Sequence, residues 1–80
     1  MLKVDTLATI KAINECVGRT VSYTELRYLY KLHGGSKGGM AEALELLVGQ
    51  RPESLEWDNR IGDRRRREVW GKVQAPINTV

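Results

Sequence analysis

The stretch SLEWDNRIGDRRRREVWGKV, residues 54–73, decides how the rest of the chain is interpreted. Apolar and polar residues alternate at both of its ends, in Leu55–Asp58 and in Val69–Val73, with the period of two that is typical of half-buried β-strands. The intervening residues 59–63 are rich in turn formers, and four consecutive arginines follow them. The pattern predicts a β-hairpin whose tip and second strand carry the densest positive charge in the chain.

This positive charge is local, because the chain as a whole is only modestly basic. The net charge of the 80 residues is +3, yet residues 60–72 hold six of the thirteen Lys and Arg residues and only two acidic ones. A concentrated cationic patch on a projecting element favours a polyanionic partner such as nucleic acid. The alternative is a solvated charge run that only keeps the hairpin soluble.

Length and composition predict one folded domain. Hydrophobic residues make up 41% of the chain and charged residues 29%, which is typical of a globular protein. No apolar run approaches the ~20 residues that span a bilayer, and the first residues lack the pattern of a signal peptide. A single cysteine excludes an internal disulfide and indicates a reducing compartment. We therefore expect a cytoplasmic protein that does not bind membranes.

The first predicted helix provides part of the core. Asp5 or Thr6 is expected to cap its start, and Gly18 is expected to end it. Apolar residues recur at helical spacing between these points, so that Cys16 should be a small buried hydrophobic residue rather than a nucleophile. The β-prone stretch Arg19–Val21 follows and is able to add a third strand to the hairpin.

Two further helices are predicted before the hairpin. Ser22–Glu25 matches a capping box, in which the serine side chain and the glutamate side chain each bind a backbone amide of the other residue, and this helix should end at His33–Gly35. Ser36 is expected to cap the third helix, which should end at Gly49.

The segment between the second and third helices is rich in glycine. Glycines in an opening helical turn cost ~1 kcal/mol each relative to alanine, so they need a reason. One reason is a close approach of the backbone to a ligand phosphate, and the other is a helix that begins only at Met40. Gly34–Gly39 lacks the spacing of a phosphate-binding loop, so we do not expect a nucleotide-hydrolysing site.

Two features are left open by the pattern, the C-terminal tail and Trp70. Residues 1–73 are assigned to the domain, and residues 74–80 to a C-terminal tail that either is flexible or lies across a neighbouring part of the chain. Trp57 shares a strand face with Leu55 and should lie in the core. Trp70 has the opposite parity to Val69 and Val73, so it is either buried through a β-bulge or exposed to a partner.

Catalytic chemistry is not expected. One cysteine and one histidine, His33, cannot supply a four-ligand zinc site. Glu42 and Glu45 share a helix face, but an exposed face of so small a domain forms no pocket. We predict a protein that is not an enzyme and needs neither a metal nor a cofactor.

The order of these elements resembles the winged helix-turn-helix superfamily. Besides the element order, the resemblance includes the helix start at Ser22–Glu25 and the Asp63–Arg65 tip, which looks like the wing of MarR-type repressors. Small phage- or plasmid-encoded regulators are closest in size. The implied fold is an α+β domain: a three-helix winged helix-turn-helix with a C-terminal β-hairpin and room for a short third strand.

The resemblance also implies a mode of binding to double-stranded DNA. The third helix would enter the major groove, and the hairpin would follow the backbone or the minor groove. The residues placed at the DNA are Arg27, Lys31, Ser36, Lys37, Arg60, Arg64, Arg65 and Arg66. Ala41, Glu42 and Glu45 would also face the groove, where the glutamates either accept hydrogen bonds from cytosine or repel phosphate.

Two functions are therefore carried forward. The first is a transcriptional or replication regulator that binds duplex DNA, expected as a homodimer. The second is a winged-helix module or inhibitor of phage type that binds a host protein. The exposed glutamates of the third helix, Trp70 and the low net charge favour the second.

Overall fold

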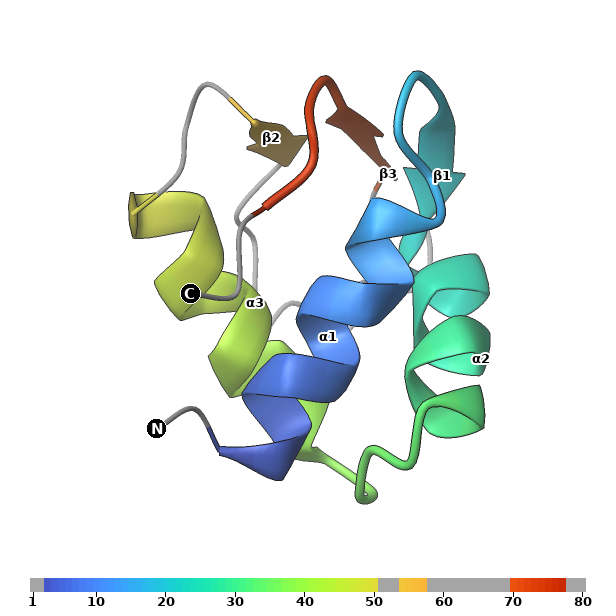
Figure 1. The fold of residues 1–80 in the computed structure, drawn as a ribbon, viewed down its shortest axis with the longest axis vertical. Coiled ribbons are helices and arrows are strands. Elements are labelled where there is room, and N and C mark those ends of the chain that lie inside the picture. Colours follow the sequence, from blue (N-terminus) through green and yellow to red (C-terminus); the bar gives the residue numbers. More distant parts are fainter. Residues whose placement is uncertain (1–2, 51–53, 58–69, 78–80) are drawn as a thin grey trace.

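The computed structural model describes residues 3–50, 54–57 and 70–77 of the chain (Figure 1). The elements, in chain order, are α1 (Val4–Asn14), β1 (Thr20–Ser22), α2 (Tyr23–Leu32), α3 (Gly39–Gln50), β2 (Leu55–Trp57) and β3 (Trp70–Val73). The prediction of an α+β fold with three helices and a small antiparallel sheet is confirmed.

The three strands form one sheet in the order β1-β3-β2, with both outer strands antiparallel to β3. The short stretch before α2 thus supplies the third strand, as the sequence allowed. Cross-strand partners Leu55 and Val73 are buried on one face together with Val21. On the other face Glu56 lies opposite Lys72, and both are exposed. The alternation read from the sequence therefore decides which face of the sheet meets the core.

Helix α1 lies between α2 and α3, and the sheet lies across one end of the three helices (Figure 1). Each helix turns most of its apolar side chains inward at helical spacing, as with Leu26 and Tyr30 of α2. Buried residues of all six elements belong to the core or pack against it, in agreement with the predicted apolar stripes. The buried core residues are Ala8, Ile10, Ala12, Ile13, Cys16, Val21, Tyr23, Leu26, Tyr30, Met40, Leu44, Leu47, Leu55, Val73 and Ile77.

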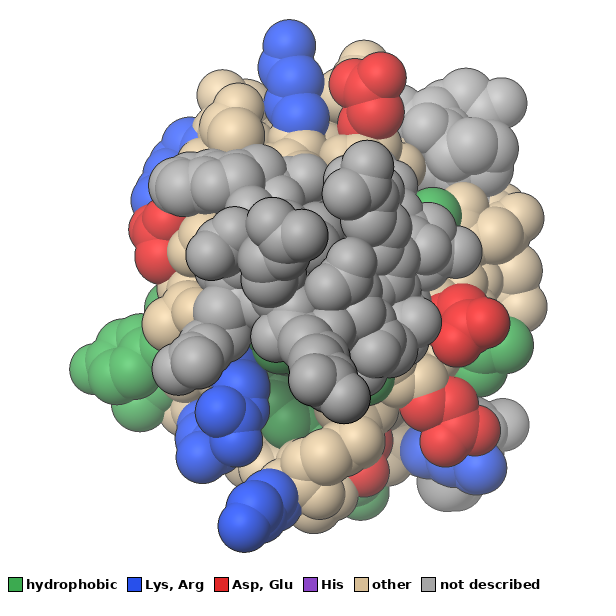
Figure 2. All heavy atoms as spheres, turned by 180° about the vertical axis from the view of Figure 1, so that it is seen from behind, with side chains coloured by type: hydrophobic (Ala, Val, Ile, Leu, Met, Phe, Trp, Pro, Cys, Tyr) green, Lys and Arg blue, Asp and Glu red, His purple; other side chains and the backbone are tan. Residues whose placement is uncertain are grey.

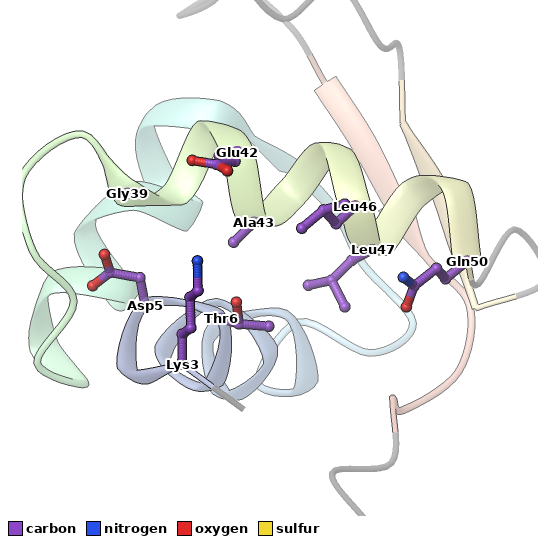
Figure 3. Close-up of a pocket in the computed structure, with 9 residues that line it drawn as sticks. All are labelled: Lys3, Asp5, Thr6, Gly39, Glu42, Ala43, Leu46, Leu47 and Gln50. Carbon is purple, nitrogen blue, oxygen red and sulfur yellow. The ribbon is translucent and has the colours of Figure 1, made fainter. Parts of the chain in front are cut away.

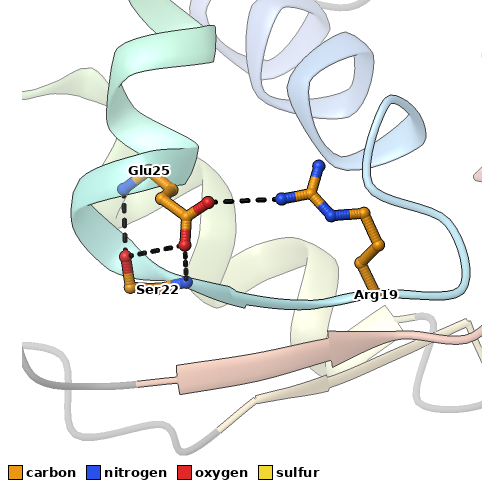
Figure 4. Close-up of polar contacts among 3 residues, drawn as sticks. All are labelled: Arg19, Ser22 and Glu25. Atoms are coloured by element: carbon orange, nitrogen blue, oxygen red, sulfur yellow. Dashed lines mark hydrogen bonds and ion pairs between the residues drawn. The ribbon is translucent and has the colours of Figure 1, made fainter.

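The start of α2 is fixed by the predicted capping box, which the structure confirms (Figure 4). Ser22 Oγ accepts a hydrogen bond from the Glu25 amide at 3.1 Å, and the Glu25 carboxylate accepts one from the Ser22 amide at 3.4 Å. The same carboxylate accepts a hydrogen bond from the Arg19 guanidinium at 3.2 Å. The helix therefore begins directly where β1 ends.

The predicted starts of the other two helices are wrong. Helix α1 begins at Val4 after Lys3, without a side-chain cap, so neither Asp5 nor Thr6 caps it. Helix α3 begins at Gly39, three residues after Ser36, and continues past Gly49 to Gln50. Asp5 and Ser36 hydrogen-bond each other, so these two side chains are engaged with each other instead of capping α1 and α3.

The chain after β3 packs against the domain as far as it is described. Ile77, which lies in the segment assigned to the tail, is 2% exposed. Its amide donates to Asn14 Oδ1 at 2.8 Å, and its carbonyl oxygen accepts from Asn14 Nδ2 at 2.9 Å. This pairing places the C-terminal segment over the end of α1.

Candidate nucleic-acid interface

The loop between α2 and α3 is held by a network around Ser36. The carboxylate of Asp5 accepts hydrogen bonds from the Ser36 amide at 2.9 Å and from its hydroxyl at 2.7 Å. The Tyr30 hydroxyl donates to the Ser36 carbonyl at 2.7 Å. These bonds lower the pKa of the Asp5 carboxyl, while burial raises the pKa of the Tyr30 phenol. Ser36, which was expected at the DNA, therefore holds the loop to α1 and α2.

Gly35 of this loop and Gly39 at the start of α3 allow the backbone to pass close to the side chains of Tyr30 and Asp5. A Cβ atom on Gly35 would lie 2.2 Å from Cζ of the Tyr30 ring. A Cβ atom on Gly39 would lie 2.2 Å from a carboxylate oxygen of Asp5. Both distances are far below a van der Waals contact. The close backbone approach that these glycines permit is therefore an approach to Tyr30 and Asp5, a reason that the sequence did not reveal.

The exposed side of α2 presents two cations next to an aromatic ring. Arg27 and Lys31 are both exposed and lie one helical turn apart, as the helical period predicted. They line a shallow hollow of about 220 Å³ together with Thr24 and two tyrosines. One of these, Tyr28, is 66% exposed and stands beside the cations. This arrangement suits an anionic partner.

Lys37 adds a third exposed cation, in the loop that the Ser36 network fixes. Within the described residues, no acidic side chain forms an ion pair with Lys37 or with Arg27 and Lys31 of α2. Arg19, by contrast, pairs with Glu25. Figure 2 shows basic side chains at the lower left and bottom of one face and acidic ones at its right edge, together with an acidic side chain at the left edge and a basic one at the lower right.

Helix α3 has the opposite character. Glu42 and Glu45 are exposed, Ala41 is half-buried, and the sequence of the helix contains no lysine or arginine. A phosphate near the middle of α3 would meet negative charge without a compensating cation from the same helix. The structure thus brings Arg27 and Lys31 together on α2. Lys37 lies in the loop just before α3, whose first turn carries the exposed Glu42.

The predicted hairpin tip lies outside the described residues, and with it Arg60, Arg64, Arg65 and Arg66. The same holds for the side chains of Trp57 and Trp70, so the predictions on them stay predictions. The backbones at these two positions belong to neighbouring strands, since Trp57 is paired with Gly71. The segment 58–69 thus joins two ends that are next to each other in the sheet.

The prediction that the exposed face with Glu42 forms no pocket is wrong, because Glu42 lines a groove of about 330 Å³ between α1 and α3 (Figure 3). Ala43 and Leu47 form its buried floor, and Leu46 at its edge is 53% exposed. The sequence Leu46-Leu47-Val48 indicated apolar surface outside the core, because three consecutive apolar residues cannot all face the same side of a helix.

The single cysteine is enclosed, and the single histidine is engaged in a hydrogen bond. Cys16 is fully buried, and this burial raises the pKa of its thiol. The burial agrees with the prediction that Cys16 is a small buried hydrophobic residue. His33 is the C-cap residue of α2 and hydrogen-bonds Glu15. In the described ranges, no three His, Cys, Asp or Glu residues are grouped so that they could hold a metal ion.

No helix among the described residues is long and apolar enough to cross a bilayer.

Comparison of the chain with models of protein families, with curated proteins and with solved structures gave no match.

Proposed function

We propose that this chain is a small winged-helix domain that binds double-stranded DNA and acts as a transcriptional or replication regulator. The observation that carries the proposal is the pair of exposed cations on α2, Arg27 and Lys31, with a further exposed cation, Lys37, in the following loop; none of the three forms an ion pair with a described acidic residue. Cations held in this way by a folded scaffold release counterions from DNA when they contact phosphates.

The fold supports the winged-helix part of the proposal. The elements follow in the order that underlies the resemblance, and β1 joins the β2–β3 pair. In a winged helix, the segment between β2 and β3 is the wing, which here contains Arg60 and Arg64–Arg66. The wing would add its arginines to the cations of α2.

The charge of α3 modifies the mode of binding that the resemblance implies. Because Glu42 and Glu45 are exposed on α3, we assign the phosphate contacts to α2, the α2–α3 loop and the wing. Contacts to phosphate position a protein on DNA but carry no sequence information. The proposed binding is therefore mainly electrostatic, with weak sequence preference.

A salt titration tests the proposal. Fluorescence anisotropy with two unrelated duplexes of about 20 base pairs should give similar affinities, and log affinity should fall with log salt with a slope near −4 to −5 for about five neutralised phosphates. A flat salt dependence would contradict DNA binding. Replacing Arg64, Arg65 and Arg66 by alanine should weaken binding to both duplexes equally, whereas unchanged affinity would remove the wing from the interface.

A protein partner is the second candidate, and one observation favours it. Tyr28 and Leu32 are 66% and 64% exposed, so apolar surface lies beside Arg27 and Lys31 on α2. Phosphate contacts do not need an exposed leucine, whereas protein interfaces combine apolar and basic residues of this kind. An acidic protein surface would contact both the basic and the apolar side chains of α2. Co-purification of a host protein that is lost on Leu32→Glu, with no retention of the chain on heparin, would favour this candidate over DNA.

A further inference from the structure

The groove between α1 and α3 has an apolar centre that faces solvent. Its floor is formed by Ala43 and Leu47, which are buried, while more than half of the Leu46 side chain is exposed at the edge. Figure 3 shows the side chains of α3 on one side of the groove and those of Lys3 and Thr6 on the other. Exposed leucine next to an apolar hollow favours the docking of another apolar surface.

The rim of the groove carries charges of both signs. Lys3 lies on the α1 side and Glu42 on the α3 side, and both are exposed. Neither forms an ion pair with another described residue. Asp5, which also lines the groove, is already engaged by hydrogen bonds from Ser36. The charge of Lys3 contributes to lowering the pKa of the Asp5 carboxyl, but Lys3 forms no ion pair with a described residue. Among the residues described, the lining thus carries a cation on the α1 side and an anion, Glu42, on the α3 side of an apolar centre.

This distribution fits one occupant better than others. In a two-fold dimer the same surface contacts itself, so an interface of this kind must be self-complementary in charge. An apolar centre with Lys3 on one rim and Glu42 on the other meets that condition, because the lysine of each copy can face the glutamate of its partner. Nucleic acid would meet the carboxylate of Glu42, and a basic peptide would meet the ammonium of Lys3.

We propose that the groove is the docking site for a second copy of this chain. Leu46 of each copy would pack over the apolar floor of the other, and Lys3 would pair with Glu42 across the interface twice. Helix α2 lies on the far side of α1 from α3 (Figure 1), so its cations stay outside this interface. The proposal is independent of DNA binding, since it concerns other side chains.

Sedimentation velocity of the full chain without DNA tests the proposal. The average mass should rise from that of one chain toward that of two over a concentration series of about 1–500 µM, a range suited to a small interface. Leu46→Glu should weaken dimerisation at least ~tenfold, because it places a carboxylate of each copy against the apolar floor of the other. Leu32→Glu, the same change at an exposed leucine of α2, is the matched control and should leave dimerisation unchanged.

A charge exchange gives a second readout that does not depend on the leucine. Lys3→Glu and Glu42→Lys should each weaken the dimer, because each places like charges opposite one another. The double variant restores opposite charges and should recover dimerisation toward the original level. A chain that is monomeric at every concentration, equal effects of Leu46→Glu and Leu32→Glu, or a double variant no better than the single ones would each overturn the proposal.

Discussion

Replacing Gly35 by alanine tests how the α2–α3 loop is built. The added Cβ would lie 2.2, 2.3 and 2.5 Å from three atoms of the Tyr30 ring, whereas ordinary contacts begin at 3.4 Å. Tyr30 is 1% exposed and belongs to the core, so the ring has no free space to enter. The loop or the ring must therefore move by more than 1 Å, the difference between the ordinary contact and the clash.

The expected cost combines two effects. Overpacking of a well-packed core costs about 1–3 kcal/mol. Displacing the loop also strains or breaks the hydrogen bond from the Tyr30 hydroxyl to Ser36, which contributes about 0.5–1.5 kcal/mol. We expect Gly35→Ala to lower the free energy of unfolding by about 2–4 kcal/mol. Urea unfolding followed by circular dichroism measures it, and with a slope of about 1 kcal/mol/M the midpoint should fall by about 2–4 M.

Gly49→Ala is the matched control. Nothing lies within 4 Å of a Cβ at this position near the end of α3, so alanine should stabilise the chain by about 0.5–1 kcal/mol through helix propensity. In a Tyr30→Leu background, Gly35→Ala should cost much less, because the atoms that it meets are gone. Equal effects of Gly35→Ala and Gly49→Ala, or a cost independent of the residue at position 30, would refute the proposed contact.

The same unfolding assay tests three other contacts. Asn14→Ala removes both hydrogen bonds to Ile77 and should cost about 1–3 kcal/mol; an unchanged midpoint would show that this pairing does not hold the C-terminal segment. The Asp5 carboxyl has a lowered pKa in the fold, so it stabilises the fold above its unfolded pKa near 3.8, and this stabilisation is lost as pH falls through the folded pKa. Asp5→Asn should therefore reduce the loss of stability between about pH 5 and pH 2. If the free energy of unfolding of the variant depends on pH as in the original chain, the bonds from Ser36 to Asp5 are not the cause of that loss. Ser22→Ala should cost about 1 kcal/mol through loss of the α2 cap, and a cost below about 0.3 kcal/mol would contradict the capping box.

Features encoded over a few residues were predictable from the sequence. The capping box at Ser22–Glu25 depends on two residues three positions apart, and the structure has it as predicted. The exposure of Arg27 and Lys31 follows from the helical period of α2. The strand β1 was also foreseen, although its pairing with β3 joins segments about 50 positions apart, because β-prone residues beside a hairpin have few other partners.

Features that depend on distant residues were missed. Asp5 and Ser36 are both good capping residues, but each is engaged by the other, 31 positions away. The pairing of Asn14 with Ile77 spans 63 positions, and a polar residue on a helix gives no sign of such a partner. The groove beside Leu46 arises only when α1 and α3 are packed together. In each of these cases the structure is decided by a tertiary contact between distant residues, which a single sequence does not reveal.

The proposed DNA-binding surface is tested most directly by comparing two lysines. Lys31→Ala and Lys11→Ala each remove one positive charge from an exposed helical position, and neither lysine forms an ion pair with a described residue. Only Lys31 lies on the α2 surface, so only its loss should weaken binding to duplex DNA and reduce the salt slope by about 0.9. If the two variants bind DNA equally well, with the same salt dependence, α2 is not the surface that contacts the phosphates.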